Sequence, residues 1–391
     1  MTRRWPAMPN LTKHPEAYIE QGKTIGIIGG GQLGQMMAFS AKAAGMKVII
    51  LDPTPQCPAA QAADDQIVAP YADVTAIKEL ARRADVLTYE FENVDLQALR
   101  DVADQVAIPQ GTNLLYTTKN RIREKTFLRD AGLQTAPFAA VKNRADLNAA
   151  VAKLGYPCVL KTCEGGYDGH GQMVLKSAQD LNDPITEEVL QYGDDILEGW
   201  VPFKMECSVM VARNTDGDIT VFPVSENIHA HEILHLSIVP ARMPVEWQQR
   251  AQRMAEKIAT AIDLKGILGV EMFVGADGQL YVNELAPRPH NSGHYTIEAC
   301  NFSQFAVHNR AICNWPLPKI KLLSPVVMVN VLGQHVAGTR RLIHEYPQWH
   351  FHDYGKAEIR HNRKMGHVTI LTDDIEETLK QIKDSHVWDD E

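Results

Sequence analysis

A glycine-rich turn between two short apolar runs, near the start of the sequence, limits the fold more than any other feature. An apolar run at 23–28 leads directly into the pattern G-x-G-x-x-G at 29–34, and a second apolar run ends at Asp52. This spacing is typical of βαβ units that bind nucleotides. It predicts a helix over 32–44 and a strand over 47–51. Glycines at a helix N-terminus favour an anion, whether or not that anion belongs to a nicotinamide cofactor.

The next part of the sequence continues this alternation. Further strand-like runs lie at 66–69, 86–89 and 106–108, with helical patterns between them. Strands that alternate with helices predict an open parallel sheet. We expect this sheet to form a Rossmann-like domain that ends near residue 118.

A different organisation follows from Lys119. A charged helix ended by Gly132 leads into strands, a long helix at 245–262 and a hairpin at 267–284, which is an α+β pattern. A proline-rich stretch at 315–325 marks another boundary. We therefore expect four parts: an extension at 1–22, a Rossmann-like domain at 23–118, a second domain at 119–318, and a small β-rich domain at 319–391.

Composition excludes several classes of function. The chain has 39 Lys and Arg against 48 Asp and Glu, a formal charge of -9, which disfavours a nucleic-acid partner. No apolar run approaches the roughly 20 residues of a membrane span, and the first 22 residues lack the apolar core of a secretory signal, so we expect a cytoplasmic protein without a membrane partner. The six cysteines form no C-x-x-C pair, and we expect free thiols.

A second glycine-rich loop lies between two strand-like runs. Four of the seven residues at 165–171 are glycine, and Lys161 ends the preceding run. Ordering so many glycines costs conformational entropy, which a flap that closes over a polyphosphate would justify. Lys161 then supplies a positive charge for phosphate oxygens. No G-K-[ST] follows, so this loop is not a Walker A motif.

The hairpin at 267–284 carries two carboxylates. If Asp277 and Gly278 form a two-residue turn, Glu271 lies directly opposite Glu284. Like charges in that position destabilise a hairpin unless a cation lies between them. Mg²⁺ with nucleotide phosphates fits oxygen ligands of this kind.

Two polar segments are candidates for substrate recognition. The loop at 285–294 is rich in groups that donate to anions, and Arg360, Arg363, Lys364 and His367 form a basic group in the last domain.

The pattern H-E-x-x-H at 231–235 is also present, but prolines at 223 and 240 and the β-like residues between them argue against the helix that zinc proteases need. We therefore expect no zinc site.

Four segments together resemble a known enzyme family. They are GGGQLGQM at 29–36, YPCVLKTCEGGYDGHGQ at 156–172, LEGWVPFKMECSV at 197–209 and YVNELAPRPHNSGH at 281–294. The combination is similar to N5-carboxyaminoimidazole ribonucleotide synthetases, the ATPase subunits of bacterial phosphoribosylaminoimidazole carboxylase. These are ATP-grasp enzymes, so the resemblance implies an ATP-grasp fold between the Rossmann-like sheet domain and the small β-rich domain.

The resemblance implies a reaction in de novo purine synthesis. ATP, bicarbonate and 5-aminoimidazole ribonucleotide would give N5-carboxyaminoimidazole ribonucleotide, ADP and phosphate through carboxyphosphate. It implies Mg²⁺, with Mn²⁺ as an alternative, no NAD, and a homodimer. An NAD-dependent oxidoreductase, a non-catalytic nucleotide-binding protein and a sister ATP-grasp ligase that uses formate remain the alternatives.

The resemblance also assigns site residues. Those implied in catalysis are Lys161, Asp168 and Arg288. Those implied in ATP binding are Arg121, Lys125, Lys161, Gly166, Tyr167, Asp168, Gly169, His170, Gly171, Gln172, Glu198, Gly199, Trp200, Val201, Glu206, His229, Asn283 and Glu284. Those implied in binding the ribonucleotide are Gly31, Gln32, Leu33, Tyr167, Asp168, Arg288, His290, Asn291, Ser292, Arg360, Arg363 and Lys364. The implied metal ligands are Glu271 and Glu284.

Overall fold

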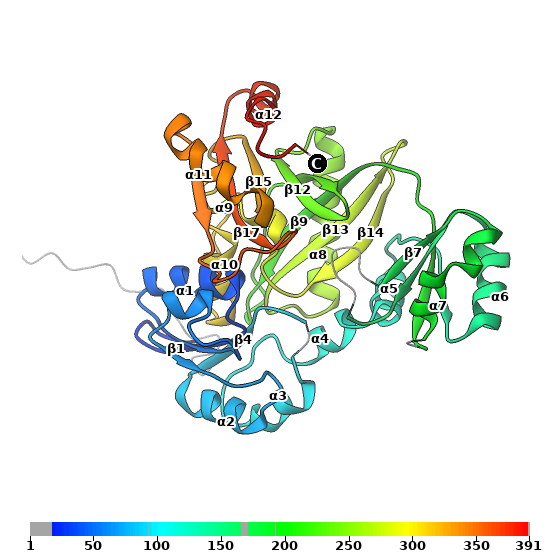
Figure 1. Cartoon of the computed structure of the whole chain (residues 1–391). Helices are drawn as coiled ribbons and strands as arrows, with labels where there is room; N and C mark the ends of the chain where they lie inside the picture. Colours follow the sequence, from blue (N-terminus) through cyan, green and yellow to red (C-terminus); the bar gives the residue numbers. More distant parts are fainter. Residues whose placement is uncertain (1–17, 93, 166–170, 192, 390–391) are drawn as a thin grey trace, which may run out of the picture.

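Three β-sheets, each with its own helices, make up the molecule (Figure 1). The structure is a computed structural model that describes residues 18–389 apart from 93, 166–170 and 192. None of the helices in these ranges is both long and apolar enough to cross a membrane. All six cysteines are buried free thiols, as predicted.

The first sheet is parallel, with strand order β3-β2-β1-β4. Helices α1 and α10 pack on one face, and α2 and α3 pack on the other. The bounds are β1 (Thr24–Ile28), β2 (Lys47–Leu51), β3 (Asp65–Ile67), β4 (Val86–Tyr89), α1 (Gln32–Ala43), α2 (Val74–Arg83), α3 (Leu96–Val102) and α10 (Gln304–Ile312). The predicted βαβ unit is confirmed.

The strand predicted at 106–108 is wrong. Only a single bridge joins Ala107 to Val86. Pro109 follows immediately and has no N–H to continue a ladder, so β4 stays at the edge of the sheet.

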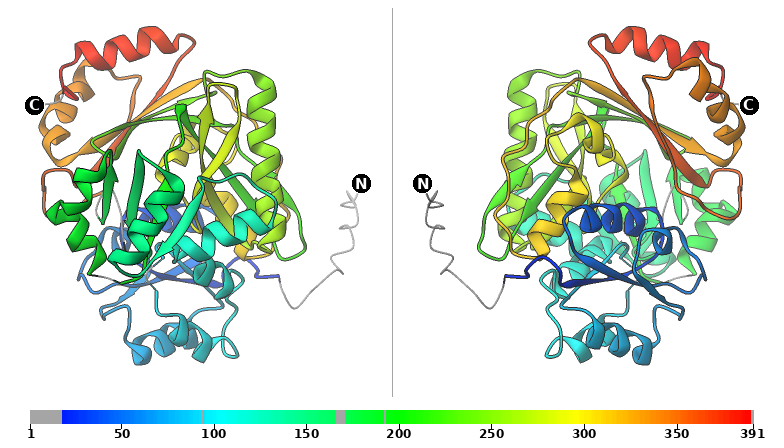
Figure 2. Two further views of the ribbon diagram at one scale, coloured as in Figure 1. Left: turned by 90° about the vertical axis from the view of Figure 1, so that its right-hand side faces the viewer. Right: turned by 90° about the vertical axis from the view of Figure 1, so that its left-hand side faces the viewer.

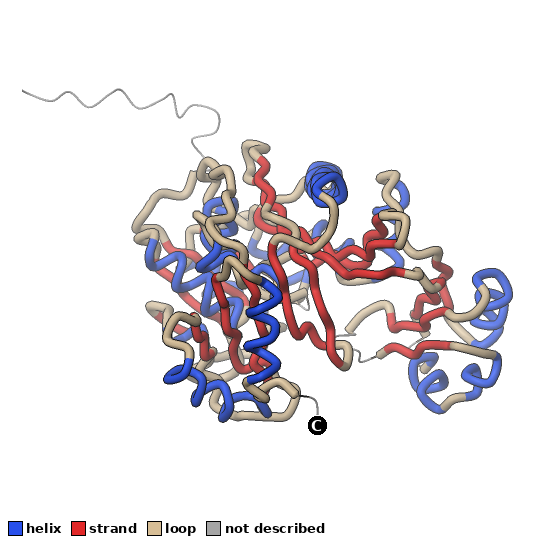
Figure 3. The backbone as a smooth tube through the Cα atoms, turned by 90° about the horizontal axis from the view of Figure 1, so that it is seen from above, coloured by secondary structure: helices blue, strands red, loops and turns tan. Residues whose placement is uncertain are grey.

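The second sheet is small and antiparallel, with strand order β5-β8-β6-β7. Two helices pack against it around a separate apolar core and lie on its outer side, at the right of Figure 3. The bounds are β5 (Phe138–Val141), β6 (Cys158–Thr162), β7 (Gln172–Leu175), β8 (Asp195–Gly199), α6 (Arg144–Leu154) and α7 (Pro184–Leu190).

The third sheet has nine strands, in the order β14-β13-β9-β11-β12-β15-β17-β16, with β10 paired to β9. Helices α4, α5 and α8 pack against the part near β13, whereas α11 and α12 pack near β15 and β17 (Figure 2). Its strands are β9 (Phe203–Arg213), β10 (Ile219–Val221), β11 (Ser225–Ala230), β12 (Ile233–Val239), β13 (Gly266–Gly275), β14 (Leu280–Ala286), β15 (Val326–Leu332), β16 (His350–Asp353) and β17 (Lys364–Leu371). The remaining helices are α4 (Asn113–Thr118), α5 (Arg121–Asp130), α8 (Val245–Ala261), α9 (Thr296–Ala299), α11 (Val336–Glu345) and α12 (Ile375–Asp384).

The last part of the chain continues the third sheet. Strand β15 pairs antiparallel with β12, from Leu236 opposite Val329 to Val239 opposite Val326. The expected small β-rich unit therefore shares its hydrogen bonding with the preceding part. The bounds of the four parts given above stay predictions.

Candidate active site

A cleft of ≈ 780 Å³ is bounded by strand residues of the second and third sheets and by residues that follow β1 and β4 of the first sheet. Fifteen of the predicted site residues line it. They are Gln32, Leu33, Arg121, Lys161, Gln172, Trp200, Glu206, His229, Glu271, Asn283, Glu284, Arg288, His290, Asn291 and Lys364.

Other predicted site residues lie elsewhere. Those that the structure describes outside the cleft wall are Gly31, Lys125, Gly171, Glu198, Gly199, Val201, Ser292, Arg360 and Arg363. Arg360 pairs with Glu358, whose carbonyl oxygen accepts from Arg363 Nη1 at 2.9 Å. Gly166, Tyr167, Asp168, Gly169 and His170 lie outside the described residues.

The two predicted metal carboxylates lie directly opposite each other on β13 and β14. Glu271 pairs with Glu284 in the antiparallel register, as predicted. The reason differs from the predicted two-residue turn, which is wrong. Gly278 N donates to Gly275 O at 2.9 Å and Gly275 N donates to Gln279 O at 2.8 Å, so the loop has three residues.

The longer loop shifts the pairing by one residue, and a β-bulge restores it. Met272 pairs with Val282 and Glu271 pairs with Glu284, which leaves Asn283 as the extra residue on β14. Neighbouring residues of a regular strand face opposite sides of the sheet. At this bulge Asn283 and Glu284 both line the cleft.

Buried charges hold this hairpin in place. Lys125 Nζ donates to Asn283 O at 2.8 Å and lies 3.3 Å from Glu198 Oε1. Lys161 Nζ donates to the other oxygen of Glu198 at 2.9 Å. Burial alone would raise the pKa of Glu198, but the two lysines outweigh it and lower this pKa to about 2. Glu198 therefore stays ionised and orients both lysines, of which only Lys161 lines the cleft.

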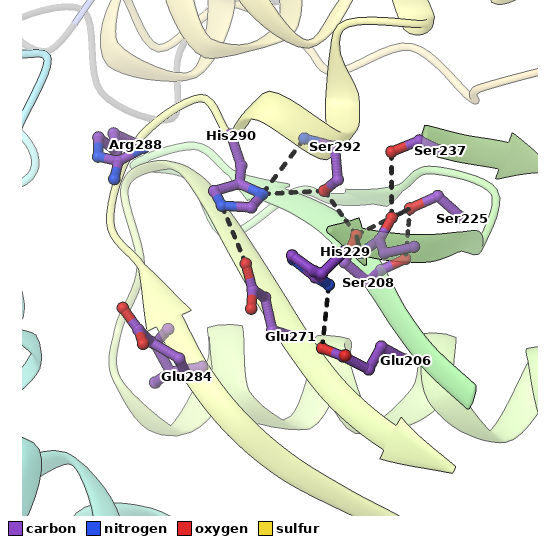
Figure 4. Close-up of polar contacts among 12 residues, drawn as sticks. Glu206, Ser208, Ser225, His229, Ser237, Glu271, Glu284, Arg288, His290 and Ser292 are labelled. Carbon is purple, nitrogen blue, oxygen red and sulfur yellow. Dashed lines mark hydrogen bonds and ion pairs between the residues drawn. The ribbon is translucent and has the colours of Figure 1, made fainter. Parts of the chain in front are cut away.

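Each facing carboxylate already has a cationic or histidine partner. Arg121 Nη1 donates to Glu284 Oε2 at 2.9 Å. His290 Nε2 lies 3.0 Å from Glu271 Oε1 (Figure 4). Burial would raise the pKa of Glu271, but the hydrogen bond from His290 and the basic groups of His229 and Arg288 lower it.

Within the described residues, no group of three or more His, Cys, Asp or Glu side chains is placed to hold a metal. Two carboxylate oxygen donors fit Mg²⁺, which takes its other ligands from water and phosphate.

A second carboxylate and histidine pair lies beside Glu271. His229 Nδ1 is 3.3 Å from Glu206 Oε2 (Figure 4). Burial would lower the pKa of His229, but the charges of Glu206, Glu271 and Glu232 together raise it. In this part of the cleft wall, each of the carboxylates Glu206 and Glu271 therefore lies beside a histidine.

Known proteins are similar in sequence to most of this chain. A family model for the ribonucleotide synthetase preATP-grasp domain matches residues 22–117, one for the ATP-grasp domain matches 126–305, and one for the phosphoribosylaminoimidazole carboxylase C-terminal domain matches 326–381. N5-carboxyaminoimidazole ribonucleotide synthase of Bacillus subtilis is 49% identical over 368 residues, which are 93% of this chain and 95% of that protein.

The chain belongs to the N5-carboxyaminoimidazole ribonucleotide synthase family.

Solved structures of synthases in this family have the same fold. One, an ADP complex, is 52% identical with a TM-score of 0.93, and the alignment covers 95% of this chain and 98% of that one. Another, from Aspergillus clavatus in complex with ADP and 5-aminoimidazole ribonucleotide, is 32% identical with a TM-score of 0.87, covering 93% and 98%. The ATP-grasp fold with its parallel-sheet domain and C-terminal domain is confirmed.

In this member of the synthase family, a carboxylate of the protein occupies the first glycine-rich turn. Glu90 accepts from Gly31 N at 2.9 Å and from Gly34 N at 2.5 Å. Asp52 accepts from Gly30 N at 2.7 Å. These N–H groups therefore already have acidic partners within the chain, and the predicted contacts of Gly31, Gln32 and Leu33 with the ribonucleotide stay predictions. Burial raises the pKa of Glu90 to about 7, although the bonds from Gly34 and Gly31 lower it.

Sequence reasoning missed several acidic residues of the cleft. Glu90 and Glu92 follow β4 directly, and Glu92 Oε1 accepts from Arg288 Nε at 2.8 Å. Glu124 accepts from Leu285 N at 2.7 Å, and burial together with the charge of Glu284 raises its pKa to about 8. The position of Glu90 and Glu92 after a parallel strand was the available signal, because ligands bind at the carboxyl ends of such strands.

The H-E-x-x-H pattern forms a β-hairpin. His231 and Glu232 have φ angles of 49° and 65° between β11 and β12, so the helix that presents this motif to zinc does not form there. Both residues line the cleft, and Gln172 Nε2 donates to Glu232 Oε2 at 3.3 Å.

Proposed function

We propose that this chain is an ATP-dependent ligase that carboxylates 5-aminoimidazole ribonucleotide with bicarbonate, releasing ADP and phosphate, in de novo purine synthesis. The observation that carries the proposal is the pair of facing carboxylates, Glu271 and Glu284, in one cleft with Lys161. Solved relatives with ADP, and with ADP and 5-aminoimidazole ribonucleotide, support this assignment of substrates.

Glu271 and Glu284 would hold Mg²⁺ together with nucleotide phosphates. When bound, the metal neutralises charge that develops on the transferred phosphoryl group. Arg121 holds Glu284 from behind at 2.9 Å, and His290 does the same for Glu271. Both carboxylates thus keep their positions before substrates arrive, which lowers the cost of organising the site.

In the proposed reaction, an oxygen of bicarbonate attacks the γ-phosphorus of ATP and ADP leaves. The product is carboxyphosphate. The exocyclic amine of the ribonucleotide then attacks its carbonyl carbon, and phosphate leaves as the C–N bond forms. Lys161 and Arg288 stabilise the charge on the transferring groups. A site closed to water is needed because water would otherwise hydrolyse carboxyphosphate.

The ribonucleotide is proposed to bind where the first and third sheets meet. Gln32, Leu33, Arg288 and Asn291 line that part of the cleft, and Lys364 reaches the cleft from β17. Phosphate binding is therefore assigned first to Lys364. Arg360 and Arg363 are retained as predictions, as are the roles of residues 166–170.

The direct test is the dependence of ADP release on each substrate. With Mg²⁺-ATP present, we expect ADP release to require both bicarbonate and 5-aminoimidazole ribonucleotide. Release that requires formate with a different purine ribonucleotide would support the sister ligase instead. ATP binding without release of ADP would support a non-catalytic protein.

We also infer that the chain works in the cytoplasm as a homodimer. Light scattering on the full chain should give about twice the monomer mass of 43.6 kDa. A mass near 43.6 kDa would contradict the dimer and leave the ligase proposal intact.

A further inference from the structure

A line of buried polar side chains runs from inside the third sheet to His290 at the cleft wall (Figure 4). His290 Nδ1 is 2.9 Å from Ser292 Oγ, which is 2.6 Å from Ser208 Oγ. Ser208 Oγ accepts from Asn227 Nδ2 at 3.0 Å. Ser208 and Ser292 are each 1% exposed, and Asn227 is 6% exposed, so these groups bond to one another instead of to bulk water.

Both ends of this line fix the direction of its hydrogen bonds. At the inner end, Ser237 Oγ donates to Asn227 Oδ1 at 3.1 Å, which turns the amide so that its NH₂ group faces Ser208. An NH₂ group only donates, whereas a carboxylate only accepts. At the outer end, His290 Nε2 lies 3.0 Å from the carboxylate of Glu271 and must carry a proton to bond to it.

Each hydroxyl between these ends has one proton, and Ser208 Oγ has two hydroxyl neighbours, Ser292 Oγ at 2.6 Å and Ser225 Oγ at 2.8 Å. We assign the Ser208 proton to the shorter contact, with Ser292. Asn227 donates to Ser208, Ser208 to Ser292, and Ser292 to His290 Nδ1. The backbone N–H of Ser292 also points at Nδ1, at 3.4 Å. In this arrangement the imidazole accepts at Nδ1 and donates at Nε2.

We propose that Asn227 and Ser208 are positioning residues that act through Ser292 to hold His290 as the Nε2–H tautomer aimed at Glu271. Partners behind a ligand-holding group commonly set its tautomer and orientation in this way. The importance of this for turnover rests on the proposed function, because Glu271 is one of the two facing carboxylates. Ser292 is predicted to contact the ribonucleotide, but its buried hydroxyl lies between Ser208 and His290.

The proposal is tested by determining the tautomer of His290 by NMR in the full chain without ligands. Protein labelled with ¹⁵N-histidine is examined by long-range ¹H–¹⁵N correlation at about pH 8, above the ordinary titration range of imidazole. The loss of one signal set in His290→Asn assigns the resonances. The variants are Ser208→Ala and Ser292→Ala. Each interrupts the hydrogen bonds between Asn227 and His290, so the second variant serves if the first does not fold. Ser225→Ala is the matched control.

Ser225 suits this purpose because its hydroxyl is also buried and lies 2.8 Å from Ser208 Oγ. It donates to Asn227 Oδ1 at 3.2 Å, but Ser237 Oγ donates to the same oxygen at 3.1 Å and still orients the amide when Ser225 is replaced. We expect the unmodified protein and Ser225→Ala to show a single Nε2–H form. Ser208→Ala and Ser292→Ala should show a mixture of both tautomers. An Nδ1–H or doubly protonated His290 in the unmodified protein would overturn the proposal, as would Ser208→Ala spectra identical to the control.

Kinetics separate positioning from a purely structural role. Ser208→Ala should lower kcat for ADP release about 10-fold with the KM for ATP unchanged, whereas Ser225→Ala should keep both values. Equal kcat values in the two variants would contradict positioning. The tautomer is measured without turnover, so a failure of the proposed function is distinguishable from a failure of this inference.

Discussion

At the scale of single residues, the pair formed by Glu271 and Glu284 carries the proposed chemistry. Glu284→Gln removes one of the two charges that would hold the metal, and we expect ADP release to fall at least about 100-fold. The free energy of unfolding should change by less than about 1 kcal/mol, since the lost ion pair with Arg121 is partly exposed and repulsion from Glu271 is relieved. Steady-state assays and urea denaturation measure both.

The matched control for Glu284→Gln is Glu226→Gln. Glu226 is a buried carboxylate of the same sheet that also pairs with an arginine, Arg242, at 2.8 Å, but it does not line the cleft. Its kcat should remain that of the unmodified protein. Normal turnover in Glu284→Gln would remove the argument from facing carboxylates.

The raised pKa of Glu90 makes the free energy of unfolding depend on pH. Its pKa is about 7 in the folded chain against an ordinary 4.5, so the folded state binds its proton more tightly than the unfolded state does. The stability from this group is complete below about pH 4.5 and is lost as the pH rises to 7. Glu90→Gln does not ionise, so relative to the unmodified protein it should gain up to about 3 kcal/mol between pH 5 and pH 8.

Urea denaturation at the two pH values tests this, with Asp64→Asn as the control. The side-chain bond from Lys42 and the backbone bond from Val48 lower the pKa of Asp64. Its contribution is therefore complete throughout the range from pH 5 to pH 8, and the difference caused by Asp64→Asn should be constant. A constant difference for Glu90→Gln as well would show that Glu90 does not titrate as the structure implies.

The Glu271–Glu284 pair and Glu90 differ in how far they could be predicted from the sequence. The opposition of Glu271 and Glu284 was predicted from residues close together in the sequence, although the two-residue turn assumed in that prediction is wrong. Glu90 bonds to Gly31 and Gly34, which are more than 50 residues away in the sequence. That contact depends on how β1 and β4 pair, which the glycine pattern does not contain.

At the scale of elements, the β13–β14 hairpin shows two deviations that cancel. A three-residue loop shifts the register and the bulge at Asn283 shifts it back. An Asp-Gly pair suggests the shorter loop because that loop is common. The bulge has no local signature, since Lys125 from another element bonds to the carbonyl of Asn283.

Gly278→Ala tests this loop. Gly278 has φ of 77°, and a Cβ there would lie 2.2 Å from ring atoms of Trp247. We expect a loss of about 3 kcal/mol in the free energy of unfolding, from backbone strain and overpacking together.

The control, Gly217→Ala, has φ of 91° but meets only the end of Arg213 at 3.5 Å, so strain alone should cost about 1 kcal/mol. Equal losses in denaturation experiments would show that Trp247 does not pack on the turn as described.

At the scale of the whole molecule, the cleft exists because three sheets meet. The parallel sheet and the β13–β14 hairpin could be predicted from local periodicity and turn residues. Their assembly could not, because it depends on pairings between distant segments, such as Leu236 with Val329, and on shared cores, such as Phe305 of α10 against α1. The sequence therefore predicted many of the residues that line the cleft, but only the structure showed how they are brought together around it.

In the proposed reaction, ATP phosphorylates bicarbonate in this cleft before the ribonucleotide is carboxylated. The most direct test supplies ¹⁸O-labelled bicarbonate with Mg²⁺-ATP and 5-aminoimidazole ribonucleotide, and follows the label by mass spectrometry of the released phosphate. We expect one ¹⁸O atom in each released phosphate, and we expect the release to depend on the ribonucleotide. Phosphate that carries no label, formed at the same rate, would show that bicarbonate is not phosphorylated.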